Sequence, residues 1–74
     1  MKVYLVIAHD EYADDGYDIL GVGTDREWAV AIRNNYIEKE HDRQFVDIVE
    51  MEANHYYNYN EREEAEENAE YYEL

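Results

Sequence analysis

Three short segments of the chain carry apolar residues with the two-residue period of a β-strand. Residues 2–9, "KVYLVIAH", place apolar side chains on both faces, which predicts a central strand covered on two sides. Residues 17–23, "YDILGVG", and residues 44–52, "QFVDIVEME", predict two further strands. In the third segment the apolar alternation changes face at Val49, so we expect a β-bulge near that residue.

A helical period follows the second strand. Residues 24–27, "TDRE", have the form of a capping box, in which the Thr24 hydroxyl accepts from the amide of Glu27 and the Glu27 carboxylate reaches back. We therefore expect an amphipathic helix from this point to about Glu40. Its apolar side consists of Trp28, Ala29, Ile32 and Tyr36.

The expected elements are strand, strand, helix and strand, and the acidic residues 10–16, "DEYADDG", form the first connection as a hairpin. A right-handed crossover that places the third strand against the first gives the sheet order 2-1-3 with antiparallel neighbours. We predict an α+β fold, namely a three-stranded antiparallel sheet with ββαβ connectivity plus an acidic C-terminal helix. One helix covers one face of this sheet, so the other face needs a cover.

The composition changes after Asn54 and divides the chain into two parts. Residues 1–54 form the ββαβ core domain, and residues 55–74 form a tyrosine-rich connector and the acidic C-terminal helix. Asn60 and Glu63 have the spacing of a second capping box. A thin apolar stripe along this helix consists of Ala65, Ala69 and Tyr72. We expect the helix to pack on the uncovered face of the sheet or to project from it.

The negative charge of the chain argues against direct binding to nucleic acid or to anionic membranes. Its 74 residues include 20 Asp and Glu against 6 Lys and Arg, which gives a net charge of -14. Such a chain repels nucleic acid and anionic membranes, because both are bound through cationic side chains. It has no cysteine, and no stretch of the length of a membrane span or signal peptide. We expect a soluble cytoplasmic protein, in the host cytosol if a phage encodes it, with basic partners.

The residues that carry most enzyme chemistry are missing from this sequence. It has no serine and a single threonine, so hydrolytic triads are excluded. Residues 11–22 fit a calcium loop poorly, because Ala13 and Val22 occupy positions that need oxygen ligands. The histidines lack the spacing of zinc ligands: His9, His41 and His55. We expect no enzyme, no cofactor and no metal site, with loose divalent binding at the acidic turn left open.

Two functions explain the acidic composition. In the first, carboxylates on a helix with a rise of about 1.5 Å per residue imitate duplex phosphates, which carry one charge per about 1.7 Å. Such a DNA mimic occupies the basic cleft of a nuclease, CRISPR effector, glycosylase or polymerase and inhibits it. The partner-binding residues are then Asp10, Glu11, Asp14, Asp15, Glu61, Glu63, Glu64, Glu66, Glu67, Glu70, Tyr71, Tyr72 and Glu73. In the second, the chain is a small acidic structural or adaptor domain that forms a homodimer through its sheet.

Three segments resemble a group of short, uncharacterised bacterial and phage proteins: "MKVYLVIAHD" (1–10), "DILGVGTDRE" (18–27) and "FVDIVEMEAN" (45–54). The resemblance covers residues 1–54 and implies a ββαβ unit with no known catalytic residues. Gly23 stands where the pattern of that group prefers an aromatic residue. By size and charge alone, the chain is also similar to phage-encoded DNA-mimic inhibitors of the anti-CRISPR and anti-restriction type.

Overall fold

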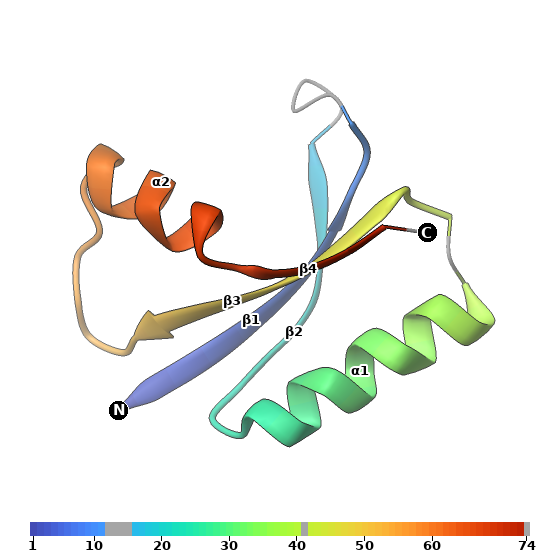
Figure 1. Ribbon diagram of the computed structural model, residues 1–74. Helices are drawn as coiled ribbons and strands as arrows, with labels where there is room; N and C mark the ends of the chain where they lie inside the picture. Colours follow the sequence, from blue (N-terminus) through green and yellow to red (C-terminus); the bar gives the residue numbers. More distant parts are fainter. Residues whose placement is uncertain (12–15, 41, 74) are drawn as a thin grey trace.

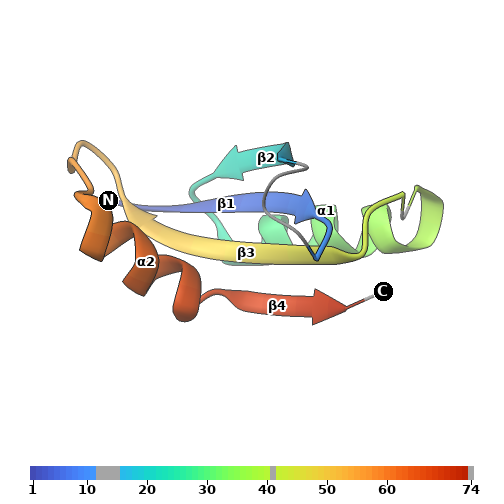
Figure 2. The same cartoon turned by 90° about the horizontal axis from the view of Figure 1, so that it is seen from above.

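An antiparallel sheet passes between two helices, as the computed structural model shows for residues 1–11, 16–40 and 42–73 (Figure 1). In chain order the described elements are β1 (Lys2–His9), β2 (Tyr17–Gly23), α1 (Arg26–Lys39), β3 (Phe45–Glu52), α2 (Tyr59–Glu67) and β4 (Glu70–Glu73). The strands of the described chain have the order β2-β1-β3-β4 (Figure 2). The α+β class is therefore confirmed, and the predicted order 2-1-3 is found within a larger sheet.

Strand β1 lies inside the sheet and is covered on both faces. Its residues Val6 and Ala8 are buried in the cluster that packs beneath α1, together with Ile48 of β3. Ile7 points to the opposite face and is also buried. The prediction of a central strand with two apolar faces is confirmed.

The β-bulge lies on β2, and the bulge predicted near Val49 is wrong. Strand β3 pairs with β1 without a break, and Leu5 stands opposite Val49. The register shift instead falls between β1 and β2, where Leu20 is the extra residue. Strand β3 needs no bulge because both of its faces are covered: Ile48 is buried on the α1 side and Val49 on the other.

Helix α1 begins one residue later than the sequence pattern suggested. Asp25 is the N-cap, and its carboxylate accepts from the Glu27 amide at 3.0 Å, so the prediction of Thr24 as the cap is wrong. An aspartate caps as well as a threonine does and also carries a negative charge at the positive end of the helix dipole. The helix buries Ala29 and Tyr36 against the sheet.

Trp28 fills the space above two glycines at the end of β2. A Cβ added to Gly23 would lie 2.6 Å from Cε3 of Trp28, and one added to Gly21 would lie 2.7 Å from its Cη2. Only glycine permits this close approach of the indole ring to the strand. The indole ring of Trp28, from α1, thus occupies the space beside the end of β2.

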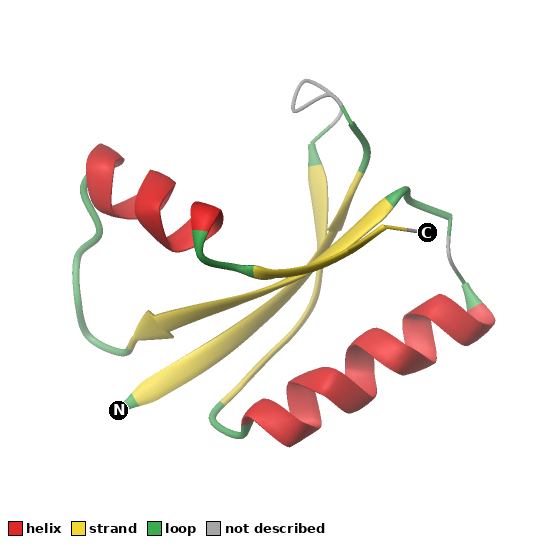
Figure 3. Cartoon of the chain, viewed as in Figure 1, coloured by secondary structure: helices red, strands yellow, loops and turns green. Residues whose placement is uncertain are grey.

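The acidic C-terminal segment changes from helix to strand after Glu67, which corrects the prediction of a helix to the end of the chain (Figure 3). Strand β4 pairs with the first half of β3, from Phe45 to Ile48. A free strand edge offers backbone hydrogen bonds, and tyrosines favour strands, so pairing prevails over the helix propensity of the glutamates. The predicted apolar stripe is broken as a result, because Ala69 and Tyr72 lie beyond the helix.

Helix α2 lies beside the second half of β3, in line with β4 (Figure 2). It begins at the capping box of Asn58 and Glu61, two residues before the predicted pair of Asn60 and Glu63. It reaches over the edge onto the second face of the sheet, where Ala65 helps to line a small cavity of about 130 Å³. The cover is partial, because β2 leaves its apolar side chains on this face exposed: Tyr17, Ile19 and Val22. No described helix is long and apolar enough to cross a membrane.

Candidate functional site

Helix α2 presents a group of exposed carboxylates. None of the nine residues of this helix is buried. Three of its glutamates line a shallow hollow of about 240 Å³: Glu63, Glu66 and Glu67. A fourth, Glu64, is exposed on the side that faces α1. Like charges at this spacing repel one another, so a cation bound here lowers the energy of the helix.

Two of the predicted partner-binding residues, Glu61 and Glu70, instead form hydrogen bonds with side chains of their own chain. His55 Nε2 lies 2.7 Å from the Glu61 carboxylate, and this hydrogen bond lowers the pKa of Glu61. Glu70 accepts from Arg33 Nη1 at 2.8 Å and also from Arg26. The hydrogen bond from Arg33, opposed by burial and assisted by the charge of Arg26, holds the pKa of Glu70 below its usual range. These two glutamates hold α2 and β4 in place.

The acidic hairpin is also tied to its own chain. Arg43 Nη1 donates to Asp10 at 2.9 Å, and its Nε donates to Asp18 at 3.1 Å, so one guanidinium joins both strands of the hairpin to the start of β3. Glu11 is exposed. The remaining acids of the predicted turn lie outside the described residues: Asp14 and Asp15.

The described residues among the predicted contacts do not form one compact surface. Helix α2 lies at the end of the sheet where β1 begins (Figure 1), whereas Asp10 and Glu11 follow the other end of β1. Strand β4 runs between them, and Glu73 stands opposite Phe45, which in turn stands opposite His9. The described acids therefore continue from α2 along β4, and Asp10 and Glu11 lie beyond β3 from them, after the end of β1.

Tyr71 and Tyr72 lie on opposite faces of β4. The ring of Tyr71 packs against Phe45, with 5.6 Å between centroids, and remains 58% exposed. Tyr72 lies on the α1 side, where the guanidinium carbon of Arg33 is 6.0 Å from its ring centroid. Each tyrosine thus packs one side of its ring onto the protein and presents the other to solvent.

A histidine–aspartate pair lies on the second face of the sheet. His9 Nε2 is 2.9 Å from Asp47 Oδ2, and its Nδ1 is 3.0 Å from the Asp10 carbonyl oxygen. Burial lowers the pKa of His9, but the hydrogen bonds to Asp10 and Asp47, with the charges of Asp47 and Glu66, raise it overall. The other carboxylate oxygen of Asp47 is buried without a hydrogen-bond partner.

Sequence reasoning missed this pair because 38 positions separate the two residues. The available signal was Asp47 itself, an acid on the second face of β3 between Phe45 and Val49. The described residues contain no group of three or more His, Cys, Asp or Glu side chains that could hold a metal ion. The chain offers this histidine–aspartate pair no serine or cysteine nucleophile.

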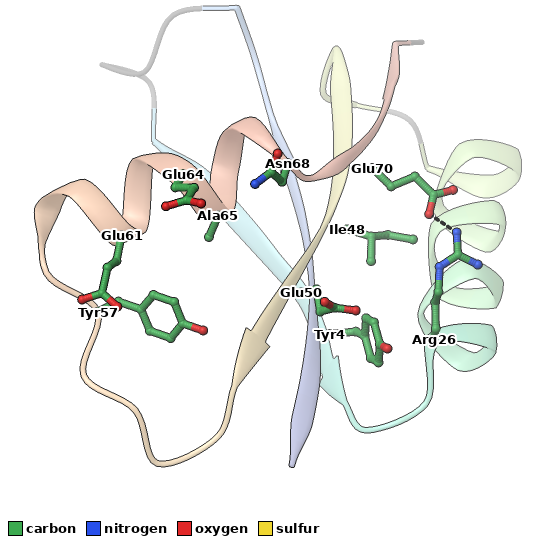
Figure 4. A pocket seen from close by; sticks show the side chains of 10 residues that line it. All are labelled: Tyr4, Arg26, Ile48, Glu50, Tyr57, Glu61, Glu64, Ala65, Asn68 and Glu70. Carbon is green, nitrogen blue, oxygen red and sulfur yellow. Dashed lines mark hydrogen bonds and ion pairs between the residues drawn. The ribbon is translucent and has the colours of Figure 1, made fainter.

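A groove opens between α1 and α2, where β4 begins and α2 diverges from β3 (Figure 4). Its volume is about 410 Å³. Ile48 and Ala65 supply apolar surface, and Tyr4 and Tyr57 supply two aromatic rings. The polar lining consists of Arg26, Glu50, Glu61, Glu64, Asn68 and Glu70. The sequence did not predict this groove, because β1, α1 and β3 line it together with the C-terminal residues 57–70.

Comparison with known proteins gives one match. No curated protein and no solved structure matches the chain. A family model described as a domain of unknown function, DUF7336, matches residues 1–62, and this match ends within α2. Because the match covers more than half of the 74 residues, the chain belongs to the DUF7336 family.

Proposed function

We propose that the protein binds the basic cleft of a nucleic-acid-binding protein as an acidic DNA mimic and inhibits it. The observation that carries this proposal is the group of exposed carboxylates on α2: Glu63, Glu64, Glu66 and Glu67. The targets that fit are nucleases, glycosylases, polymerases and CRISPR effectors, because each binds phosphates through lysine and arginine. The similarity in size and charge to phage-encoded mimics supports the same function.

The contacts of the lysine and arginine side chains within the protein support the proposal. Arg33 and Arg26 are bound to Glu70, and Arg43 is bound to the hairpin acids. Lys2 lies 3.4 Å from Glu50, and Arg62 donates to a backbone carbonyl oxygen at 3.0 Å. These five basic side chains therefore bind groups of their own chain, and the field of the α2 carboxylates acts on the surroundings.

The dimensions of α2 define how much of a duplex it can imitate. Nine helical residues span about 13 Å, which corresponds to about eight duplex charges at one per about 1.7 Å. The helix is shorter than the sequence suggested, so the mimic also needs exposed acids beyond it, notably Glu73 on β4 and Glu11 at the hairpin base. We infer an elongated contact that follows the β3–β4 side.

Three changes on α2 test the proposal. The variant E63Q/E66Q/E67Q keeps the size of each side chain and removes three charges from one hollow. We expect its affinity for the target to fall about tenfold at low salt, since each exposed pair contributes up to about 1 kcal/mol. The wild-type protein should displace DNA from the same target, and its affinity should fall steeply as salt rises.

The matched control is E27Q/E38Q/E40Q, which removes three exposed charges from around α1. It changes the net charge by the same amount and should retain most of the affinity. Equal losses in the two triple variants would show that net charge alone drives binding, and the proposed α2 surface would be rejected.

A homodimer through the second sheet face is the alternative. The observation in its favour is the exposed apolar patch of β2, where Tyr17 and Ile19 are each 60% exposed and Val22 is 57% exposed. Contiguous apolar patches on a soluble protein often mark interaction sites. Sedimentation of the purified protein decides the matter: a dimer that I19K dissociates supports the alternative, and a monomer at all concentrations rejects it.

A further inference from the structure

We propose that the groove between α1 and α2 is a receptor for one arginine side chain of the basic partner. This inference rests on the proposed function, because it names a contact that such a partner makes. It concerns a different surface of α2, since the groove is lined by Glu64, whereas the hollow is lined by Glu63, Glu66 and Glu67.

The apolar part of the groove suits the aliphatic stem of an arginine. Ile48 is buried beneath it, and Ala65 is the small residue on the inner side of α2. The ladder between β3 and β4 ends at the pair of Ile48 and Glu70, and none of the described strands pairs with β3 beyond this point on that edge. Long cationic side chains bury their methylene groups on such surfaces and keep the charged end near water.

The carboxylates around the groove suit the charged end of that side chain. Glu50, Glu61 and Glu70 are already paired with Lys2, His55 and the two arginines of α1. Glu64 also lines the groove, and the ion pairs found among the described residues do not include it. A guanidinium that enters beside α2 therefore gains Glu64 without displacing an internal cation.

The protein's own Arg26 indicates which cation fits. Its side chain extends from α1 into one end of the groove and binds Glu70 there (Figure 4). The groove already holds one guanidinium beside a carboxylate, with the ring of Tyr4 nearby (Figure 4). A planar guanidinium stacks on aromatic rings and binds carboxylates with two hydrogen bonds, whereas the ammonium of lysine does neither as well.

Two contacts hold the aromatic ring of Tyr57 in place in the lining of the groove. Its hydroxyl accepts a hydrogen bond from the Glu52 amide at 2.7 Å, and its ring packs edge-to-face on His55 with 4.5 Å between centroids. A ring held in this way offers contact area with little loss of conformational entropy on binding. The NMR signals of Tyr57 and Tyr4 are therefore suitable reporters of occupancy.

The test is an NMR titration with Nα-acetyl-arginine amide, with Nα-acetyl-lysine amide as the comparison. We expect arginine to shift the ring signals of Tyr4 and Tyr57 more strongly than lysine does. E64Q should weaken arginine binding about fivefold, while E67Q, an equal charge change on the same helix, should alter it less than about twofold. Both variants change exposed residues, and unchanged amide spectra establish that each is folded.

The outcomes separate this inference from the proposed function. If E64Q and E67Q have equal effects, or if arginine and lysine act alike, the groove is not an arginine receptor. The proposed function then still stands if E63Q/E66Q/E67Q lowers affinity for the target. If arginine binds as expected but the triple variant leaves target affinity intact, the assignment of the groove as an arginine receptor is retained and the DNA-mimic function is rejected.

Discussion

The two helices flank the same sheet but are held to it in different ways. Helix α1 spans 14 residues and buries Ala29 and Tyr36, whereas α2 spans nine residues and buries none. Helix α1 is fixed by removal of apolar surface from water, and α2 by its capping box, by His55 and by the strand that follows it. The exposed positions of α2 are thus free of packing requirements, and their glutamates are not needed to form the core.

The two faces of the sheet also differ in how completely their apolar residues are buried. Val6, Ala8, Val46 and Ile48 pack with α1 into one buried cluster. On the second face Ile7 and Val49 are buried, but the apolar residues of β2 stay exposed. The α1 side therefore supplies most of the stability, and the α2 side carries the exposed carboxylates that we propose as a partner-binding surface.

The largest expected effect is on the free energy of unfolding, and it is the difference between alanine substitutions of two valines on opposite faces of the sheet. Val6 is fully buried, so Val6→Ala should lower the free energy of unfolding by about 2 to 3 kcal/mol, through lost burial and a residual cavity. Val22 is 57% exposed, so Val22→Ala should cost less than about 0.5 kcal/mol. Urea unfolding measures both. Equal costs would mean that a second copy of the chain covers the β2 patch in solution.

The next effect concerns the attachment of β4 to α1. Glu70→Gln removes the charge that Arg33 and Arg26 bind, and should destabilise the protein by about 1 kcal/mol, because solvent screens a carboxylate that is 38% exposed. Amide hydrogen exchange of residues 70–73 should accelerate most. Glu73→Gln on the same strand is the control and should change the exchange little.

The same ion pairs make a pH-dependent contribution. The pKa of Glu70 is lowered in the folded state, so its contribution is present above the ordinary carboxyl pKa and is lost as the pH falls through the lowered value. The stabilities of the wild type and of Glu70→Gln should converge in acid. If their difference persists after the carboxylate is protonated, the effect of the substitution does not arise from the ion pairs.

The smallest effect should appear at the pair of His9 and Asp47. The pKa of His9 is raised in the folded state, so its contribution is complete below the ordinary histidine pKa and is lost as the pH rises through the raised value. The stability of the wild type should therefore fall over this window relative to that of Asp47→Asn. An NMR titration of His9 checks the sign, because the variant should show a lower pKa.

The local pattern correctly predicted the elements that bury apolar residues. The two-sided strand over residues 2–9 and the helix that carries Ala29 and Tyr36 were both found where the periodicity placed them. Their positions depend on short-range alternation, which the sequence displays directly. Boundaries were less accurate: the cap is Asp25 and the bulge is at Leu20, because neighbouring side chains compete for such roles.

The strand at the C-terminal end of the described chain was not predictable from the local sequence pattern. The glutamates of residues 61–73 favour a helix, yet Glu70 to Glu73 form a strand on the edge of β3. That edge exists only after β1 and β3 have paired, so no local pattern contains it. The groove beside α2 and the contact between His9 and Asp47 likewise join residues from distant segments.

The sequence by itself determined the α+β class, the central strand, the main helix and the large excess of negative charge. These follow from residue spacing and composition, which need no knowledge of distant contacts. Tertiary structure decided which acids are bound internally and which face solvent. Glu70 and Asp10 became part of the scaffold because arginines on other elements reach them, whereas Glu64 and Glu67 remained on the surface. The reason is geometric: whether a carboxylate meets a cation of its own chain depends on the packing of whole elements.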